Sequence, residues 1–216
     1  MKRSKRILAL LLSMVLLLGM LPMSALAADS TFSDVKTSDW FYDDVRYVCE
    51  NGLMNGTGSG TFSPKATTTR GMIVTILYRL AGSPAVTASA PFADVAPDSY
   101  CADAAAWAAE TGVAAGIGGG RFAPQRAITR AELAAMLYRF AARQDGGVTN
   151  SAAMTAADTA FSDAAQIPAY ATQAVAWAAE TGLIRGDAGR FLPQSSAARA
   201  QTAAILHRFC ELKTDK

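Results

Sequence analysis

One stretch of the chain, AITRAE at residues 127–132, places groups that could bind an anion at the start of a helix. Thr129 is suited to cap the helix, and Glu132, three residues later, can reach back to the N–H of the cap. Arg130 then lies in the first turn, where free backbone N–H groups and the helix dipole favour negative charge. Its planar guanidinium suits a carboxylate or a phosphate. A capping box beside a solvated arginine is the alternative interpretation.

Two related stretches indicate that the motif belongs to an internal repeat. TRGM at residues 69–72 stands 60 residues before it, and ARAQ at residues 198–201 places Arg199 69 residues after Arg130. Thr69 is a second expected cap, whereas the third copy has alanine in place of the threonine and glutamine in place of the glutamate. We therefore expect the copy around Arg130 to provide the most complete site and the copy around Arg199 the least complete one.

The same plan of two helices surrounds each copy. A phenylalanine, an aspartate and a later aromatic residue precede a first amphipathic helix, which ends at a glycine followed by an apolar residue. A second glycine, a Phe-x-Pro stretch and the arginine follow, and the arginine begins a second helix with apolar residues spaced by three and four. A short extended piece is expected before each proline. The pattern predicts a mainly α fold, and repeats of about 50 ordered residues should pack together because none can close a core alone.

The first 27 residues are typical of a secretory signal peptide. Four basic residues are followed by an apolar run from Ile7 to Leu21, a proline and the small-residue site Ala25-Leu26-Ala27. The run of about 15 residues is short for a membrane span, and an uncleaved anchor is the alternative. Cleavage after Ala27 leaves 16 basic and 18 acidic residues, a net charge of −2, and no transmembrane segment in the mature chain. Because no basic block survives, nucleic acid is not an expected partner.

Residue types that metal or hydrolytic chemistry needs are scarce. His207 is the one histidine, and it occupies the position that tyrosine holds in the other two repeats, which favours packing. Cys49, Cys101 and Cys210 are odd in number and widely spaced, so we expect small buried side chains rather than a metal site. A disulfide between Cys49 and Cys210 is the alternative. We expect no metal, no cofactor and no catalytic residue.

In this order the landmarks resemble those of the S-layer homology repeat, present here in three tandem copies. The resemblance divides the chain into a signal peptide (1–27) and three repeats (28–91, 92–155 and 156–216). It implies a pseudo-threefold arrangement of helical repeats around a central helix bundle, with grooves between neighbours. It also implies non-covalent attachment to the cell envelope, through a secondary cell-wall polysaccharide that is linked to peptidoglycan and often carries pyruvate ketals.

The resemblance assigns three sets of candidate polysaccharide-binding residues. Arginines at the helix starts are expected to bind the ketal carboxylate, aromatic residues to cover sugar faces, and aspartates to accept hydrogen bonds from sugar hydroxyls. The sets are Arg70, Arg130 and Arg199; Trp40, Tyr100 and Tyr170; and Asp34, Asp94 and Asp163. Core packing is the alternative role for the aromatic residues, and turn or cap hydrogen bonding is the alternative for the aspartates.

Two functions from different classes follow. The first is a cell-wall-binding protein of the bacterial surface, secreted and held at the cell wall or S-layer, without enzymatic activity. The alternative is a small secreted carbohydrate-active or wall-remodelling enzyme, because acidic residues are plentiful enough for a carboxylate pair. The first is favoured because the three repeats account for almost all of the sequence after the leader.

Overall fold

The computed structural model describes residues 32–144 and 161–214 of the 216-residue chain. The expected signal peptide lies outside these residues, as does most of the linker between the second and third repeats. The described residues are mainly helical, as predicted, and contain six α-helices and two short 3₁₀ helices. The α-helices are α2 (Tyr42–Glu50), α3 (Arg70–Leu80), α4 (Ala102–Glu110), α5 (Arg130–Ala142), α6 (Thr172–Glu180) and α7 (Arg199–Thr214), and the 3₁₀ helices are η2 (Ala164–Gln166) and η3 (Ala169–Ala171).

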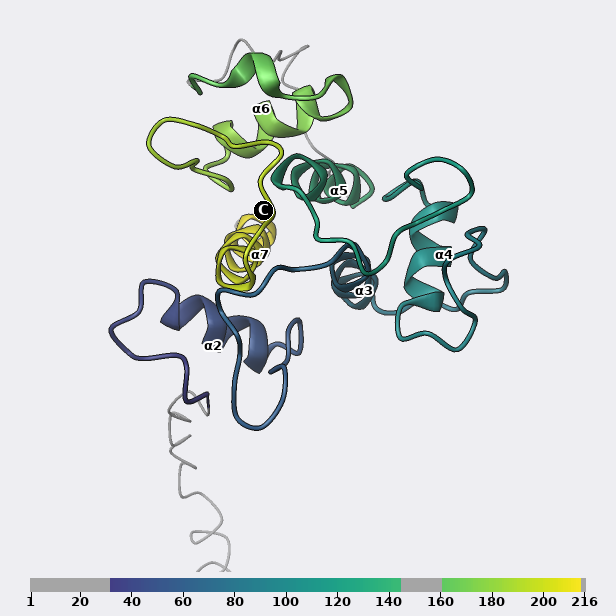
Figure 1. Ribbon diagram of the computed structural model, residues 1–216, viewed down its shortest axis with the longest axis horizontal. Coiled ribbons are helices and arrows are strands. Elements are labelled where there is room, and N and C mark those ends of the chain that lie inside the picture. The colour runs from purple at the N-terminus through teal and green to yellow at the C-terminus, as the bar shows by residue number, and fades with distance from the viewer. Residues whose placement is uncertain (1–31, 145–160, 215–216) are drawn as a thin grey trace, which may run out of the picture. The chain divides into compact units, whose positions relative to one another are not determined.

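The helices pair across repeats rather than within them. The second helix of each repeat packs against the first helix of the next, so that α3 contacts α4, α5 contacts α6, and α7 closes the ring on α2. In Figure 1, α3, α5 and α7 lie at the centre and the shorter α2, α4 and α6 lie outside them. Because each pair draws its helices from two repeats, no repeat completes its core without a neighbour.

An aromatic contact marks each helix pair at the same position. The ring centroids of Tyr78 and Trp107 are 5.7 Å apart, and those of Tyr138 and Trp177 are 5.6 Å apart. At the third pair His207 stacks on a tyrosine, Tyr47, at 4.0 Å, and its Nδ1 lies 2.9 Å from Asp44 Oδ1. The histidine therefore has the packing role that its place in the repeat predicts.

Three backbone hydrogen bonds join the repeats in a closed cycle immediately before the second helices. Thr68 N–H donates to Ala197 O at 2.9 Å, Ala197 N–H donates to Ile128 O at 3.1 Å, and Ile128 N–H donates to Thr68 O at 2.9 Å. All three residues are fully buried. The neighbouring caps, Thr69 and Thr129, are extended, with ψ of 162° and 158°. Each repeat thus contributes one short extended segment to the centre of the unit.

The residue before each proline does not adopt the extended conformation that the sequence predicts. Ser63, Ala123 and Leu192 have φ of 57°, 58° and 58°, in the left-handed region, which costs an L-residue about 1–2 kcal/mol. An aspartate from the start of the same repeat supports this turn, since its two carboxylate oxygens accept the N–H of the residue and of the phenylalanine before it. The extended backbone lies a few residues later instead, at the central cycle.

Cys49, Cys101 and Cys210 form no disulfide with one another, so the alternative disulfide between Cys49 and Cys210 is not formed. Cys101 is buried and the other two are half-buried, and burial raises the pKa of the Cys49 thiol. None of the helices in the described ranges has both the length and the apolar character needed to cross a bilayer.

Candidate functional site

The start of each second helix is built by the capping motif and by the neighbouring repeat. The Thr129 hydroxyl accepts the N–H of Glu132 at 3.2 Å, and Glu132 Oε2 accepts the N–H of Thr129 at 3.0 Å, which completes a capping box on α5. Thr69 accepts the N–H of Met72 on α3. In the third repeat Gln201 Oε1 still accepts the N–H of residue 198, at 3.1 Å.

The remaining N–H groups of these first turns are occupied, and the expectation that they attract an anion is wrong. Arg130 N–H donates to Ser195 O at 2.9 Å, and Ala131 N–H donates to Pro193 O at 3.1 Å. The first two N–H groups of α3 and α7 bind carbonyls of the following repeat in the same way. Because protein carbonyls satisfy these donors, an acidic ligand must be bound by side chains.

The three motif arginines are buried and point into the next repeat. Each Nε donates to the carbonyl of the Phe-x-Pro phenylalanine, and each guanidinium lies over the ring of that residue. The pairs are Arg70 with Phe122 (2.9 Å), Arg130 with Phe191 (2.7 Å) and Arg199 with Phe62 (2.8 Å). Their guanidinium carbons lie 4.8, 5.3 and 4.4 Å from the ring centroids. The arginines therefore join the repeats, a role that the sequence analysis did not consider.

The structure gives the aspartates the turn role, whereas it leaves the aromatic residues exposed and outside the core. Both carboxylate oxygens of Asp34, Asp94 and Asp163 accept backbone N–H groups at 2.7–2.8 Å, which is the turn role. Trp40, Tyr100 and Tyr170 are 65%, 56% and 54% exposed, so they are not core residues. Exposed rings beside the helix starts are available to a ligand, whereas the aspartates already serve the fold.

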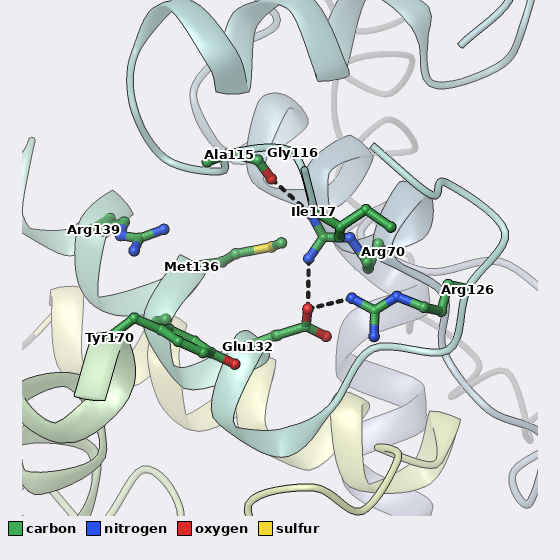
Figure 2. A pocket seen from close by; sticks show the side chains of 10 residues that line it. Arg70, Ala115, Gly116, Ile117, Arg126, Glu132, Met136, Arg139 and Tyr170 are labelled. Carbon is green, nitrogen blue, oxygen red and sulfur yellow. Dashed lines mark hydrogen bonds and ion pairs between the residues drawn. The ribbon is translucent and has the colours of Figure 1, made fainter. Parts of the chain in front are cut away.

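The structure brings one arginine of the first repeat together with residues of the other two in a pocket of about 450 Å³ (Figure 2). Arg70 comes from α3, and Glu132, Met136 and Arg139 come from one face of α5. Arg126 comes from the loop before α5, and Tyr170 from η3 of the third repeat. Of the nine residues assigned to sugar binding, this pocket contains two, Arg70 and Tyr170. This pocket lies at Arg70, and α5 of the complete motif supplies Glu132, Met136 and Arg139 to it.

Glu132 is the electrostatic centre of this pocket. Its Oε1 accepts hydrogen bonds from Arg126 Nη2 and from Arg70 Nη1, the latter at 3.0 Å, while its Oε2 stays in the capping box. Burial acts to raise the pKa of Glu132, but the Thr129 N–H and the two arginines outweigh it and hold that pKa below its ordinary value. Arg70 Nη2 donates further to Ala115 O at 2.8 Å. Glu132 is therefore ionised at neutral pH, and its charge is matched by two cations.

Two basic residues of the pocket were missed by the sequence analysis. Arg126 has no counterpart in the other repeats, where alanine and serine stand at positions 66 and 195. Arg139 recurs at the end of each second helix, as Arg79 and Arg208, but its position alone does not show that it lines a pocket. The spacing of Glu132, Met136 and Arg139 at i, i+4 and i+7 was the available signal, since it places them on one helix face. Within residues 32–144 and 161–214 no cluster of metal-binding side chains occurs.

Fold and site together define a three-repeat module in which an inter-repeat pocket presents arginines and an exposed ring. The family model for the S-layer homology domain matches residues 31–71, 91–134 and 160–203, and the chain belongs to this family. The match identifies a secreted cell-surface protein of bacteria with a role in attachment to the cell envelope and to components of the cell wall.

Similar proteins include both enzymes and S-layer proteins. The chain is 30% identical to an endoglucanase of Bacillus sp. (strain KSM-635), over 95% of its own length and 22% of the endoglucanase. It is 30% identical to an amylopullulanase of Thermoanaerobacterium thermosulfurigenes, over 87% and 10% of the two chains. It is 28% identical to the S-layer protein sap of Bacillus anthracis, over 88% and 22%. The chain thus spans about a fifth or less of these relatives, and its likeness to the enzymes is confined to that part of their length.

Proposed function

We propose that the pocket between Arg70, Glu132 and Tyr170 binds a secondary cell-wall polysaccharide linked to peptidoglycan, through an acidic group such as a pyruvate ketal. The observation that carries this proposal is the charge of the pocket. Three arginines line it against one glutamate, so a ligand meets a net charge of +2. A fixed carboxylate on a sugar complements such a pocket because a guanidinium donates two parallel hydrogen bonds to it.

The apolar side of the pocket fits a sugar ring. Tyr170 is 54% exposed and Ile117 is 47% exposed, and both line the pocket. Aromatic and aliphatic surfaces cover the C–H face of a pyranose, while the tyrosine hydroxyl remains a donor because burial and the charge of Glu132 raise the pKa of Tyr170. Ring contact and charge thus act on the same ligand unit.

The remaining assigned residues are proposed to serve the other inter-repeat grooves. By the pattern of the pocket with Arg70 and Tyr170, we place Tyr100 with Arg199 beside the start of α3, and Trp40 with Arg130 beside the start of α7. We propose that Asp34, Asp94 and Asp163 accept hydrogen bonds from sugar hydroxyls through the lone pairs that their turn contacts leave. Simultaneous binding at several grooves would raise the apparent affinity for the cell wall through avidity. We further propose that the chain acts by attachment alone and catalyses no reaction.

Titration calorimetry with polysaccharide released from cell walls tests the proposal. The purified protein is titrated with the native polysaccharide and with the same material after its carboxylates are converted to methyl esters. We expect esterification to weaken binding by about tenfold or more, the value of a charge-assisted hydrogen bond. Equal affinity for the two preparations would show that acidic groups are not what the pocket recognises.

A further inference from the structure

We propose that Arg126 and Arg139, rather than the motif arginine Arg70, contact the acidic groups of the glycan, and that Glu132 holds Arg126 in place for this contact. This inference rests on the proposed function and names the residues that would recognise the acidic group. The side chain of Arg70 is 4% exposed, and its hydrogen bonds go to the protein. Its three nitrogens donate to Phe122 O, Ala115 O and Glu132, so Arg70 is used by the protein itself.

Arg126 combines exposure with a fixed backbone. Its side chain is 40% exposed, and one of its terminal nitrogens, Nη2, binds Glu132 Oε1. Its backbone is held on both sides, since its N–H donates to Ala123 O at 3.1 Å and its carbonyl accepts the N–H of Arg70 at 3.0 Å. A guanidinium has five N–H donors, and a single carboxylate oxygen leaves most of them for a ligand. Arg126 is therefore positioned as a preorganised anion contact.

Arg139 provides a second cation on the opposite side of the pocket. Figure 2 shows Arg126 and Arg139 on either side of Glu132 and Met136, with Tyr170 below Arg139. Arg139 is half-buried and lines the pocket together with Met136. Its positive charge can therefore act on a ligand that lies over Met136.

The charge pattern distinguishes this groove from the related one beside Tyr100. A pocket of about 250 Å³ there is lined by one arginine, Arg79, together with Asp98 and Asp103. Its lining charges sum to −1, against +2 in the pocket with Arg126. The first repeat also has methionine at position 72, where the second has Glu132. The groove beside Tyr100 therefore lacks the excess positive charge that Arg126 and Arg139 give to the pocket at Arg70.

Sedimentation with intact sacculi separates the two arginine roles. We expect Arg126→Ala and Arg139→Ala each to weaken binding by about tenfold or more, and Arg126→Lys to recover part of the loss. Arg143→Ala is the matched control, because it removes the same charge from the same repeat at an exposed side chain outside the pocket. It should bind like the wild type. Binding of Arg126→Ala at wild-type strength would overturn the inference.

Glu132→Gln tests the positioning role. Glutamine retains the cap, as Gln201 does in the third repeat, but it removes the charge that fixes Arg126 and raises the pocket charge from +2 to +3. If Glu132 positions Arg126, binding weakens although the pocket is more positive. If Glu132 only reduces the positive charge, binding becomes tighter, and the positioning role is refuted. A cooperative urea transition confirms that the variant is folded, at a midpoint below that of the wild type because the buried Arg70 loses its ionised partner.

Soluble competitors identify the acid and keep this inference distinct from the proposed function. Elution of the wild type from sacculi by a methyl glycoside that carries a pyruvate ketal assigns a carboxylate, and elution by glucose 6-phosphate assigns a phosphate. Elution by neither would refute the anion contact. If the wild type fails to sediment with intact sacculi, the proposed function itself is wrong. If it sediments and Arg126→Ala does so equally well, only the assignment of Arg126 fails.

Discussion

Replacing Arg199 by alanine tests whether the motif arginines hold the repeats together. Arg199 closes the ring between the third and first repeats, where Nε donates to Phe62 O at 2.8 Å and Nη2 donates to Asn55 O at 2.6 Å. The guanidinium carbon also lies 4.4 Å from the centroid of the Phe62 ring. The residue is 5% exposed, so water cannot easily replace these contacts.

The expected cost follows from those contacts. A hydrogen bond from a charged donor contributes about 1.5–3 kcal/mol, and a buried carbonyl left without a donor costs a similar amount. Burial of the guanidinium offsets part of this, because burial lowers the pKa of Arg199 despite the opposing effect of Cys49 and Asp34. We expect Arg199→Ala to lower the free energy of unfolding by about 3 kcal/mol. For a domain of this size that corresponds to a fall in Tm of about 6–12 °C.

Urea unfolding followed by tryptophan fluorescence measures this effect. Arg199→Lys should lose most of the same stability, because a lysine ammonium cannot span both carbonyls in the guanidinium geometry. Arg121→Ala, at an exposed side chain, should change the free energy of unfolding by less than about 0.5 kcal/mol. If Arg199→Ala unfolds within that same margin of the wild type, the arginines do not hold the repeats together.

Three further predictions concern the turns and caps. Asp163→Ala removes the acceptor of the Phe191 and Leu192 N–H groups and should lower the free energy of unfolding by about 2–3 kcal/mol in urea titrations. An unchanged midpoint would show that this carboxylate does not stabilise the turn. Thr129→Ala should cost about 1 kcal/mol in the same assay, and no loss would show that the cap contributes nothing. The third concerns acid. Burial acts to raise the pKa values of Asp163 and Glu132, but the hydrogen-bond donors around each carboxylate outweigh burial and lower both pKa values. The ionised carboxylates therefore stabilise the fold fully above their pKa in the unfolded state. This stabilisation is lost as the pH falls through their lowered pKa in the folded state. The urea midpoint of the wild type should therefore decrease as the pH is lowered below about 4. The midpoint of Asp163→Asn should decrease less steeply with pH, and equal pH dependences of the two proteins would contradict this prediction.

The helices and their order could be predicted from the sequence because each has local signals. The glycine stops, the apolar stripes and the caps act within one or two turns, and their threefold recurrence reinforces each signal. The spacing of Thr129 and Glu132 likewise contains the whole capping box of α5. Family membership and the mainly α fold follow from these local features.

The sequence could not show which helix of a neighbouring repeat packs against each helix, because that contact leaves no local signal. Periodicity shows that Trp107 lies on a buried stripe, but nothing in its own repeat shows that Tyr78 of the preceding repeat covers it. For the same reason the sequence does not indicate that Arg70 binds Phe122 O of the following repeat. The left-handed conformation of Ser63 opposes the local preference of a residue before proline, and it depends on Asp34, 29 residues earlier.

The sequence predicted which types of residue would form the candidate site, but it did not predict where in the fold the site lies. Arginine with an exposed aromatic residue was expected, and Arg70 with Tyr170 supplies that pair. Arg126 was missed because it occurs in a single repeat, and reasoning from recurrence selects what all copies share. Shared residues such as Asp34 hold the common fold, whereas a residue peculiar to one groove is suited to set what that groove binds.

Sedimentation of the purified protein with cell-wall sacculi tests the central claim most directly. One half of the sacculi keeps its secondary polysaccharide, and the other half is chemically stripped of it. We predict that the protein sediments with the intact sacculi and stays in solution with the stripped ones. Equal sedimentation with both would show that the protein attaches to peptidoglycan itself, and would contradict the polysaccharide as its ligand.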